Sequence, residues 1–156
     1  MSSWPIRQRI LGVDLGRVRI GIAVSDELGL LAHPVKTIPA SKDAVKLIRE
    51  IVREKDVERV VVGLPRQMNG TMGEAAAEAL AFAEKLRKLL PCEVVTWDER
   101  LTTIAANRAL RDGGKKMRDS RKIVDQVAAQ MILQGYLDGL HIARNRDPDR
   151  EVRQND

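Results

Sequence analysis

Acidic residues occur at three places where apolar segments would otherwise be buried. Asp14 follows the apolar run RILGV, Asp98 and Glu99 follow EVVTW, and Asp125 lies within KIVDQVAAQMILQGYL. Burying a carboxylate costs free energy unless a partner compensates for it, so each position is a candidate for chemistry. Converging carboxylates suit Mg²⁺ or Mn²⁺, and two such ions can hydrolyse a phosphodiester. The pattern favours a metal-dependent nuclease.

Each acid also has an ordinary structural explanation. Asp14 could shape the turn beside Gly16. The two acids after EVVTW could belong to a simple strand-to-helix loop, and strand alternation allows only one of them to join Asp14. Asp125 could pair with Lys122 or Arg121 at the border of its helix. The three acidic positions are informative only in combination, because the order of the elements allows all three to meet at one sheet edge.

Basic residues concentrate between Arg100 and Lys122. Eight Lys and Arg residues there oppose two acids, a net charge of +6, whereas the whole chain carries +5. Such a stretch is typical of a surface that binds a polyanion, with a solvated helix face as the alternative. It joins two of the acidic sites along the chain and would hold a phosphate backbone near them. The candidate substrate-binding residues here are Arg100, Lys115, Lys116, Arg118 and Arg121.

The elements that must position these residues follow from hydrophobic periodicity and breaker residues. Strands are predicted at 9–15, 20–25, 30–38, 59–63 and 93–97. Helices are predicted at 43–55, from 74 to about 89, from Thr102 or Thr103 to about 112, and from about Ser120 to Gly139. The first two strands form a hairpin, and RVVVG at 59–63 suggests a central parallel strand. This order predicts a mixed sheet with helices packed on it.

Two local expectations are more detailed. Thr71 and Glu74 fit a capping box at the start of a helix. In the last helix Asp125 falls beside Ile132, at the margin of the apolar stripe. That stripe consists of Val124, Val127, Ala128, Met131, Ile132 and Gly135.

Composition limits the class of protein. The 156 residues suit one domain, expected at 1–140, followed by a polar and flexible tail at 141–156. We expect no secretory signal and no membrane segment, because no apolar run is long enough. The single Cys92 fits a reducing cytoplasm. Isolated His33 and His141 argue against a zinc site, and no nucleophile elbow is visible.

Four motifs resemble the YqgF/RuvX family of pre-16S rRNA nucleases and Holliday junction resolvase-like proteins. They are DLGRVRIGIAVSD (14–26), VVGLPRQMNGTMGE (61–74), WDERLTT (97–103) and VDQVAAQMILQGYL (124–137). The resemblance implies an α/β RNase H-like fold, a mixed central sheet with helices on both faces. It also implies a nuclease that uses Mg²⁺ or Mn²⁺ on structured nucleic acid. The expected activity is processing of the 5′ end of pre-16S rRNA during ribosome biogenesis.

The resemblance also assigns residues. Asp14 matches the first-strand acid and Asp125 the acid of the last helix, while the DER motif supplies Asp98 or Glu99, with Glu99 preferred. These four are the candidate catalytic residues, and Asp14, Glu99 and Asp125 are the candidate metal ligands. Arg19 matches a family motif and joins the candidate substrate-binding residues, whereas Met72 stands where the family pattern has an acid.

Other functions stay open at this point. One is a Holliday junction resolvase-like DNA endonuclease, and another is a nucleic-acid binding module without catalysis. A phosphotransferase of the actin and sugar-kinase type shares the fold, but 156 residues hardly allow its second domain. The oligomeric state is also open, with a homodimer as one option.

Overall fold

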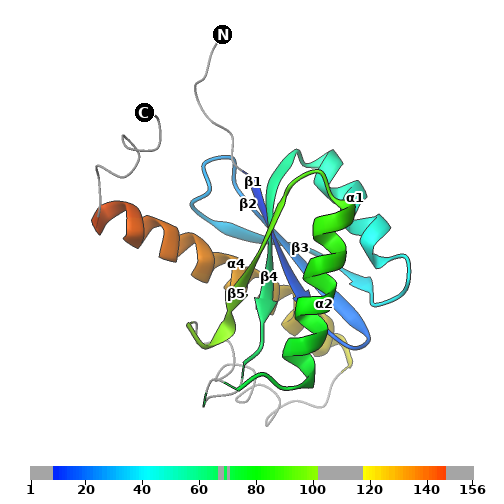
Figure 1. Cartoon of the computed structure of the whole chain (residues 1–156). Coiled ribbons are helices and arrows are strands. Elements are labelled where there is room, and N and C mark those ends of the chain that lie inside the picture. Colours follow the sequence, from blue (N-terminus) through cyan, green and yellow to red (C-terminus); the bar gives the residue numbers. More distant parts are fainter. Residues whose placement is uncertain (1–8, 67–68, 70, 102–117, 147–156) are drawn as a thin grey trace.

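Five strands form one mixed sheet with helices on both faces (Figure 1). The computed structural model describes residues 9–66, 69, 71–101 and 118–146, and side chains of the last segment at 126–143. The strand order is β3-β2-β1-β4-β5. No helix in these segments is both long and apolar enough to cross a membrane.

The elements largely follow the predicted order. The strands are β1 (Arg9–Leu15), β2 (Arg19–Ser25), β3 (Ala32–Pro39), β4 (Val57–Leu64) and β5 (Glu93–Asp98). The helices are α1 (Ala44–Glu54), α2 (Glu74–Leu89), the short 3-10 helix η1 (Glu99–Leu101) and α4 (Arg118–Arg146). The helix predicted to end near residue 112 lies outside the described residues.

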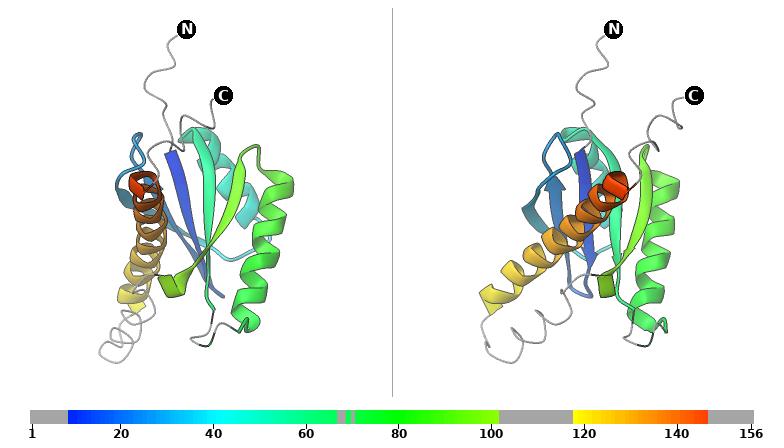
Figure 2. Two further views of the ribbon diagram at one scale, coloured as in Figure 1. Left: turned by 60° about the vertical axis from the view of Figure 1, so that its left-hand side comes forward. Right: turned by 90° about the vertical axis from the view of Figure 1, so that its left-hand side faces the viewer.

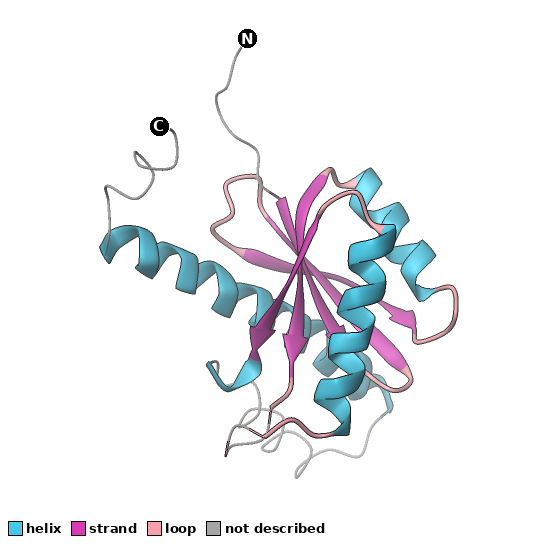
Figure 3. Cartoon of the chain, in the orientation of Figure 1, coloured by secondary structure: helices cyan, strands magenta, loops and turns pink. Residues whose placement is uncertain are grey.

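The sheet topology brings several chain ends to one edge. β1 and β2 form the predicted antiparallel hairpin, and β4 lies parallel to β1 on one side and to β5 on the other. The carboxyl ends of β1, β4 and β5 therefore lie at the same edge, where the arrowheads of β4 and β5 lie side by side in Figure 3. Because Leu15 pairs with Ile20, the start of β2 also reaches this edge.

Two apolar cores lie on opposite faces of the sheet. One is formed by α1, α2 and alternate strand residues such as Val13 and Val62. The other is formed by α4 and residues such as Ile10 and Val61. Among the described elements, Figure 2 shows α4 on one side of the sheet, with α1 and α2 opposite. This arrangement confirms the expected helices on both faces.

Helix α4 approaches β1 very closely. A Cβ built on Gly12 would lie 2.8 Å from the Leu133 Cβ and 3.0 Å from the Ala129 carbonyl oxygen, so only glycine fits there without a shift. The Gln134 side chain fixes the helix laterally: its Oε1 accepts the Ala32 N–H at 2.9 Å and its Nε2 donates to the Leu30 carbonyl at 3.0 Å. The position of α4 over the sheet is thus set by close packing and by specific hydrogen bonds.

Two local predictions were wrong, and a third was right in part. Helix α2 begins after Gly73, so the N-cap position holds glycine and not Thr71, and no side chain caps the helix. The Thr71 N–H, which a capping box would direct to Glu74, donates to the Asn69 side-chain oxygen instead. Helix α4 continues past Gly139 to Arg146. Its buried face includes Ala128 and Ile132, as predicted, and Met131 packs partly buried against the same core. The face also includes Ala129, Leu133 and Leu137, which the predicted stripe left out.

Candidate active site

Two acidic side chains are buried at the carboxyl edge of the sheet. Asp14 on β1 is 6% exposed and Glu99, just after β5, is 5% exposed. Asp14 follows Gly12 by two residues, so strand alternation puts both on the face that α4 covers. Glu99 lies on this face as well, because its Oε1 comes within 2.7 Å of a Cβ built on Gly63. The edge therefore carries two buried carboxylates on one face.

Gly63 of β4 lies between these two acids. Strand β4 runs between β1 and β5, and Val62 pairs with Val13, so Gly63 stands level with Asp14. Gly63 itself pairs with Trp97 on β5. The Glu99 carboxylate thus leaves the end of β5 and lies over the neighbouring strand, on the side towards Asp14.

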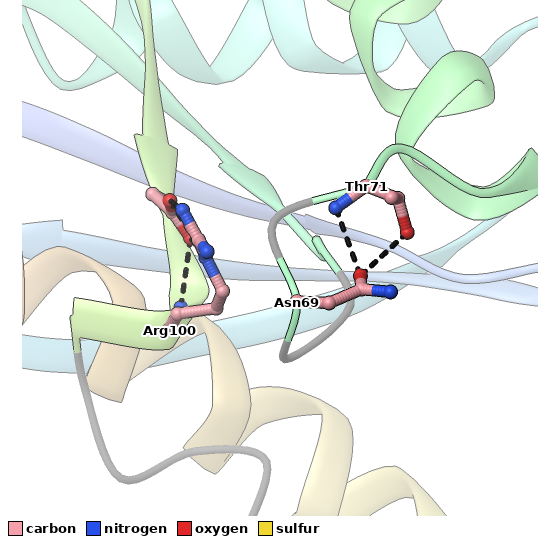
Figure 4. Close-up of polar contacts among 4 residues, drawn as sticks. Asn69, Thr71 and Arg100 are labelled. Atoms are coloured by element: carbon pink, nitrogen blue, oxygen red, sulfur yellow. Dashed lines mark hydrogen bonds and ion pairs between the residues drawn. The ribbon is translucent and has the colours of Figure 1, made fainter.

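Asp98 points to a different partner. Its carboxylate accepts the Arg100 backbone N–H at 3.0 Å and forms an ion pair with the Arg100 guanidinium at 2.6 Å (Figure 4). The hydrogen bond from the Arg100 side chain holds the pKa of the Asp98 carboxyl below its usual range, and Arg66 adds to this effect. Asp98 therefore fixes the turn after β5, in which Glu99 faces inward.

Two exposed arginines flank the acidic edge. Arg100 belongs to η1, and Arg66 lies in the loop after β4. The positive charge of Arg66 helps to lower the pKa of Asp98. Beyond Arg66, Asn69 and Thr71 form a hydrogen-bonded turn in the same loop, drawn in Figure 4. Arg19 starts β2 at this edge, and its carbonyl oxygen accepts the Gly16 N–H at 3.0 Å. Cationic side chains from three segments thus occur at the edge that holds the buried acids.

The remaining predicted site residues are only partly placed. Asp125, Arg118 and Arg121 belong to α4, in the part of the helix whose side chains the structure does not describe. Lys115 and Lys116 lie outside the described residues altogether. Among the side chains that are described, no group of three or more His, Cys, Asp or Glu could hold a metal ion. The structure thus brings together Asp14 and Glu99, and it separates Asp98 from them.

Two residues of this edge were missed in the sequence. Gly63 ends a β-branched strand, and a glycine within a strand is a signal of close approach by another group. Arg66 follows Pro65, just after the run predicted to be a strand. The sequence shows this cation close to a strand end, but it does not show which residue the cation contacts.

Comparisons with known proteins agree with this geometry. The sequence profile described as "RuvX: Holliday junction resolvase" matches residues 8–139. A protein of Nocardia farcinica named "Putative pre-16S rRNA nuclease" is 50% identical over 143 residues, covering 86% of this chain and 79% of that protein. A Clostridium tetani protein of the same name is 47% identical over 135 residues, covering 85% and 98%.

A solved structure supports the fold. RuvC of T. thermophilus in complex with Holliday junction substrate matches with a TM-score of 0.52 at 17% identity, covering 86% of this chain and 96% of that chain. The fold and the family matches together define an RNase H-like nuclease, a hydrolase that acts on phosphodiester bonds. Within that class, this chain belongs to the RuvX (YqgF) family. The family and the fold expected from the sequence motifs are confirmed.

Nucleases of this resolvase-like class generally need a divalent metal ion. The residues present fit such an ion, because carboxylate oxygens are the donors that hard divalent cations prefer. Asp14 and Glu99 supply such oxygens from two strand ends on one face, with a small residue between them.

Proposed function

We propose that this chain processes the 5′ end of pre-16S rRNA by metal-dependent hydrolysis, with Asp14, Glu99 and Asp125 as metal ligands. The observation that carries the proposal is the pair of buried carboxylates, Asp14 and Glu99, on one face of the sheet at its carboxyl edge. The Mg²⁺ or Mn²⁺ ion held there would activate a water and stabilise the leaving oxygen. Asp125 is included because α4 passes over this face and carries it one turn before Ala129.

The protein residues contribute position and charge. The strand ends under Asp14 and Glu99 are rigid, and burial keeps bulk water away from both carboxylates. Arg66 lies exposed after β4 and can neutralise a substrate phosphate, whereas the Arg100 guanidinium is paired with Asp98. Arg19 at the start of β2 and the basic residues Lys115, Lys116, Arg118 and Arg121 extend this surface along the chain.

Structured RNA is the preferred substrate because relatives at 47–50% identity carry the name of a pre-16S rRNA nuclease. The chain also spans 98% of the Clostridium tetani relative, so the likeness covers essentially that whole protein. The family description as a Holliday junction resolvase makes branched DNA the second candidate.

Cleavage assays separate these substrates. A 5′-extended pre-16S rRNA fragment, an unstructured RNA and a four-way DNA junction are incubated with the protein in Mg²⁺ or Mn²⁺. We expect cleavage of the rRNA fragment near the mature 5′ end and none of the unstructured RNA. Preferential cutting of the junction would instead assign the chain to branched DNA.

The Asp14→Asn variant tests the site itself. It should lose cleavage while keeping the wild-type fold, because Asn retains the shape but lacks the charge that holds a metal ion. Asp43→Asn is the matched control, since Asp43 is exposed and its side chain forms no cap bond with α1. Wild-type cleavage by Asp14→Asn would remove Asp14 from the metal site.

A further inference from the structure

We infer that Gly63 is the positioning residue for the Glu99 carboxylate, a role that rests on the proposed function of Glu99. Glu99 follows β5, yet its carboxylate lies over β4 rather than beyond the sheet edge. It can do so because Gly63 presents only backbone on that face. The absence of a side chain on one strand thus sets the place of an acid that comes from the next strand.

The space around Gly63 leaves no room for a methyl group. A Cβ there would lie 2.7 Å from Glu99 Oε1 and 2.5 Å from Ile132 Cδ1, both shorter than real contacts of such an atom. Ile132 is fully buried among other apolar side chains of α4, and dense packing leaves it little freedom to move. A methyl group at position 63 therefore forces Glu99 Oε1, Ile132 Cδ1 or both to move, and a variant that also shortens Ile132 isolates the effect on Glu99.

The direction of that displacement matters. Gly63 is level with Asp14 on one side and pairs with Trp97 of β5 on the other. A methyl group between them would push the Glu99 carboxylate back towards β5 and away from Asp14. The two acids would then hold one ion less well, although both would still be present.

Gly12 provides a matched comparison within the same sheet face. A Cβ on Gly12 would also collide with α4, at 2.8 Å from the Leu133 Cβ and 3.0 Å from the Ala129 carbonyl oxygen. No acidic atom is among these neighbours. Gly12→Ala therefore shows the effect of displacing α4 alone. Gly63→Ala shows the effect of displacing α4 together with the effect of displacing Glu99.

The experiment measures Mn²⁺ binding by calorimetry, the Mn²⁺-induced rise in Tm, and the Mn²⁺ concentration for half-maximal cleavage. We expect both glycine variants to melt at lower temperature without metal. Gly63→Ala should also weaken Mn²⁺ binding by roughly 10- to 100-fold, the range for changes to groups that orient a metal ligand. Gly12→Ala displaces α4, which carries the proposed ligand Asp125, but leaves Glu99 in place, so it should weaken Mn²⁺ binding less than Gly63→Ala does.

A double variant guards against a folding defect. Gly63→Ala/Ile132→Ala removes the collision with the helix and leaves only the collision with Glu99, so it should bind Mn²⁺ more weakly than Ile132→Ala alone. Equal Mn²⁺ affinity in these two proteins would overturn the positioning role. Glu99→Gln separates this failure from a failure of the proposed site: if Glu99→Gln itself binds Mn²⁺ and cleaves normally, Glu99 is no ligand and both proposals fall.

Discussion

Two consecutive acids at the end of β5 have different surroundings. Glu99 is buried on the α4 face, whereas Asp98 accepts hydrogen bonds from the backbone and side chain of Arg100. Side chains of adjacent strand residues point to opposite faces, so only one of the two can join Asp14. Asp98 affects the site only indirectly, because its hydrogen bonds to Arg100 stabilise the turn that contains Glu99.

This difference predicts unequal effects of two amide substitutions. Glu99→Gln should lower the cleavage rate by at least roughly a hundredfold, equivalent to about 2.7 kcal/mol of lost transition-state stabilisation. Asp98→Asn should keep most of the activity, because the Asn oxygen can still accept the Arg100 N–H. Single-turnover cleavage rates of both variants decide the point, and the reverse order of activities would make Asp98 the ligand.

Cys92 is half-buried, and this burial raises the pKa of its thiol. The folded protein therefore disfavours the thiolate. The neutral Cys92 thiol therefore adds to the free energy of unfolding. This contribution is complete below the thiol pKa of the unfolded chain, about 8.5, and is lost as the pH rises through the higher thiol pKa of the folded protein. We expect alkaline unfolding curves to show this loss in the wild type, and Cys92→Ser to be less sensitive to pH in that range. Identical pH profiles would contradict the prediction.

At the scale of elements, α4 decides which residues can reach the acidic edge. The helix contacts β1 at Ala129 and Leu133, where Gly12 allows close approach. Position 125 lies one turn before Ala129 on the same helical face, since residues four apart are stacked along a helix. Asp125 therefore stays a proposed ligand, and its substitution is the test.

Thermal melts of Asp125→Asn test this placement. If Asp125 shares the site with Asp14 and Glu99, its removal should relieve like-charge repulsion and leave the metal-free protein as stable or more stable. The same variant should show a smaller Mn²⁺-induced rise in Tm and no cleavage, because a ligand that binds only the native state stabilises it. If Asp125 merely pairs with Lys122 or Arg121, the loss of stability should be at most about 1 kcal/mol, with an unchanged response to Mn²⁺.

At the scale of the whole molecule, charge is unevenly distributed along the chain. The net +6 of residues 100–122 exceeds the +5 of the complete sequence, so the remainder is close to neutral. The segment begins at η1 beside the buried acids and ends within α4. We expect a polyanionic substrate to be attracted to this segment.

Replacement of Lys115, Lys116 and Arg118 by Ala should weaken nucleic-acid binding for all sequences. The slope of log affinity against log salt should become shallower by about 0.7 to 0.9 for each phosphate that the variant no longer neutralises. Replacement of Lys42, Lys46 and Lys85 by Ala serves as the control, because it removes the same charge from residues remote from 100–122 in sequence. Lys42 precedes α1, Lys46 lies in α1 and Lys85 lies in α2. Equal slopes for both triple variants would place the binding surface elsewhere.

Much of the fold could be predicted because its signals are local. The run RVVVG predicted β4, the alternation around residues 20–25 predicted the second strand of the hairpin, and the Ala-rich segment predicted α2. Errors arose where a side chain had a choice of partners. The Thr71 N–H donates to the Asn69 side chain rather than to Glu74, and α2 begins after Gly73; spacing along the chain does not reveal that competing acceptor.

The acid types, their order along the chain and the elements that carry them can all be read from the amino-acid sequence. Four ordered motifs were enough to indicate the family and a carboxylate-based nuclease. Only the tertiary structure decided that Glu99 rather than Asp98 lies buried over β4, that Gly63 makes room for it, and that Arg66 lies near Asp98. The physical reason is that these contacts join residues of different strands and loops, so they depend on sheet register and on the approach of α4.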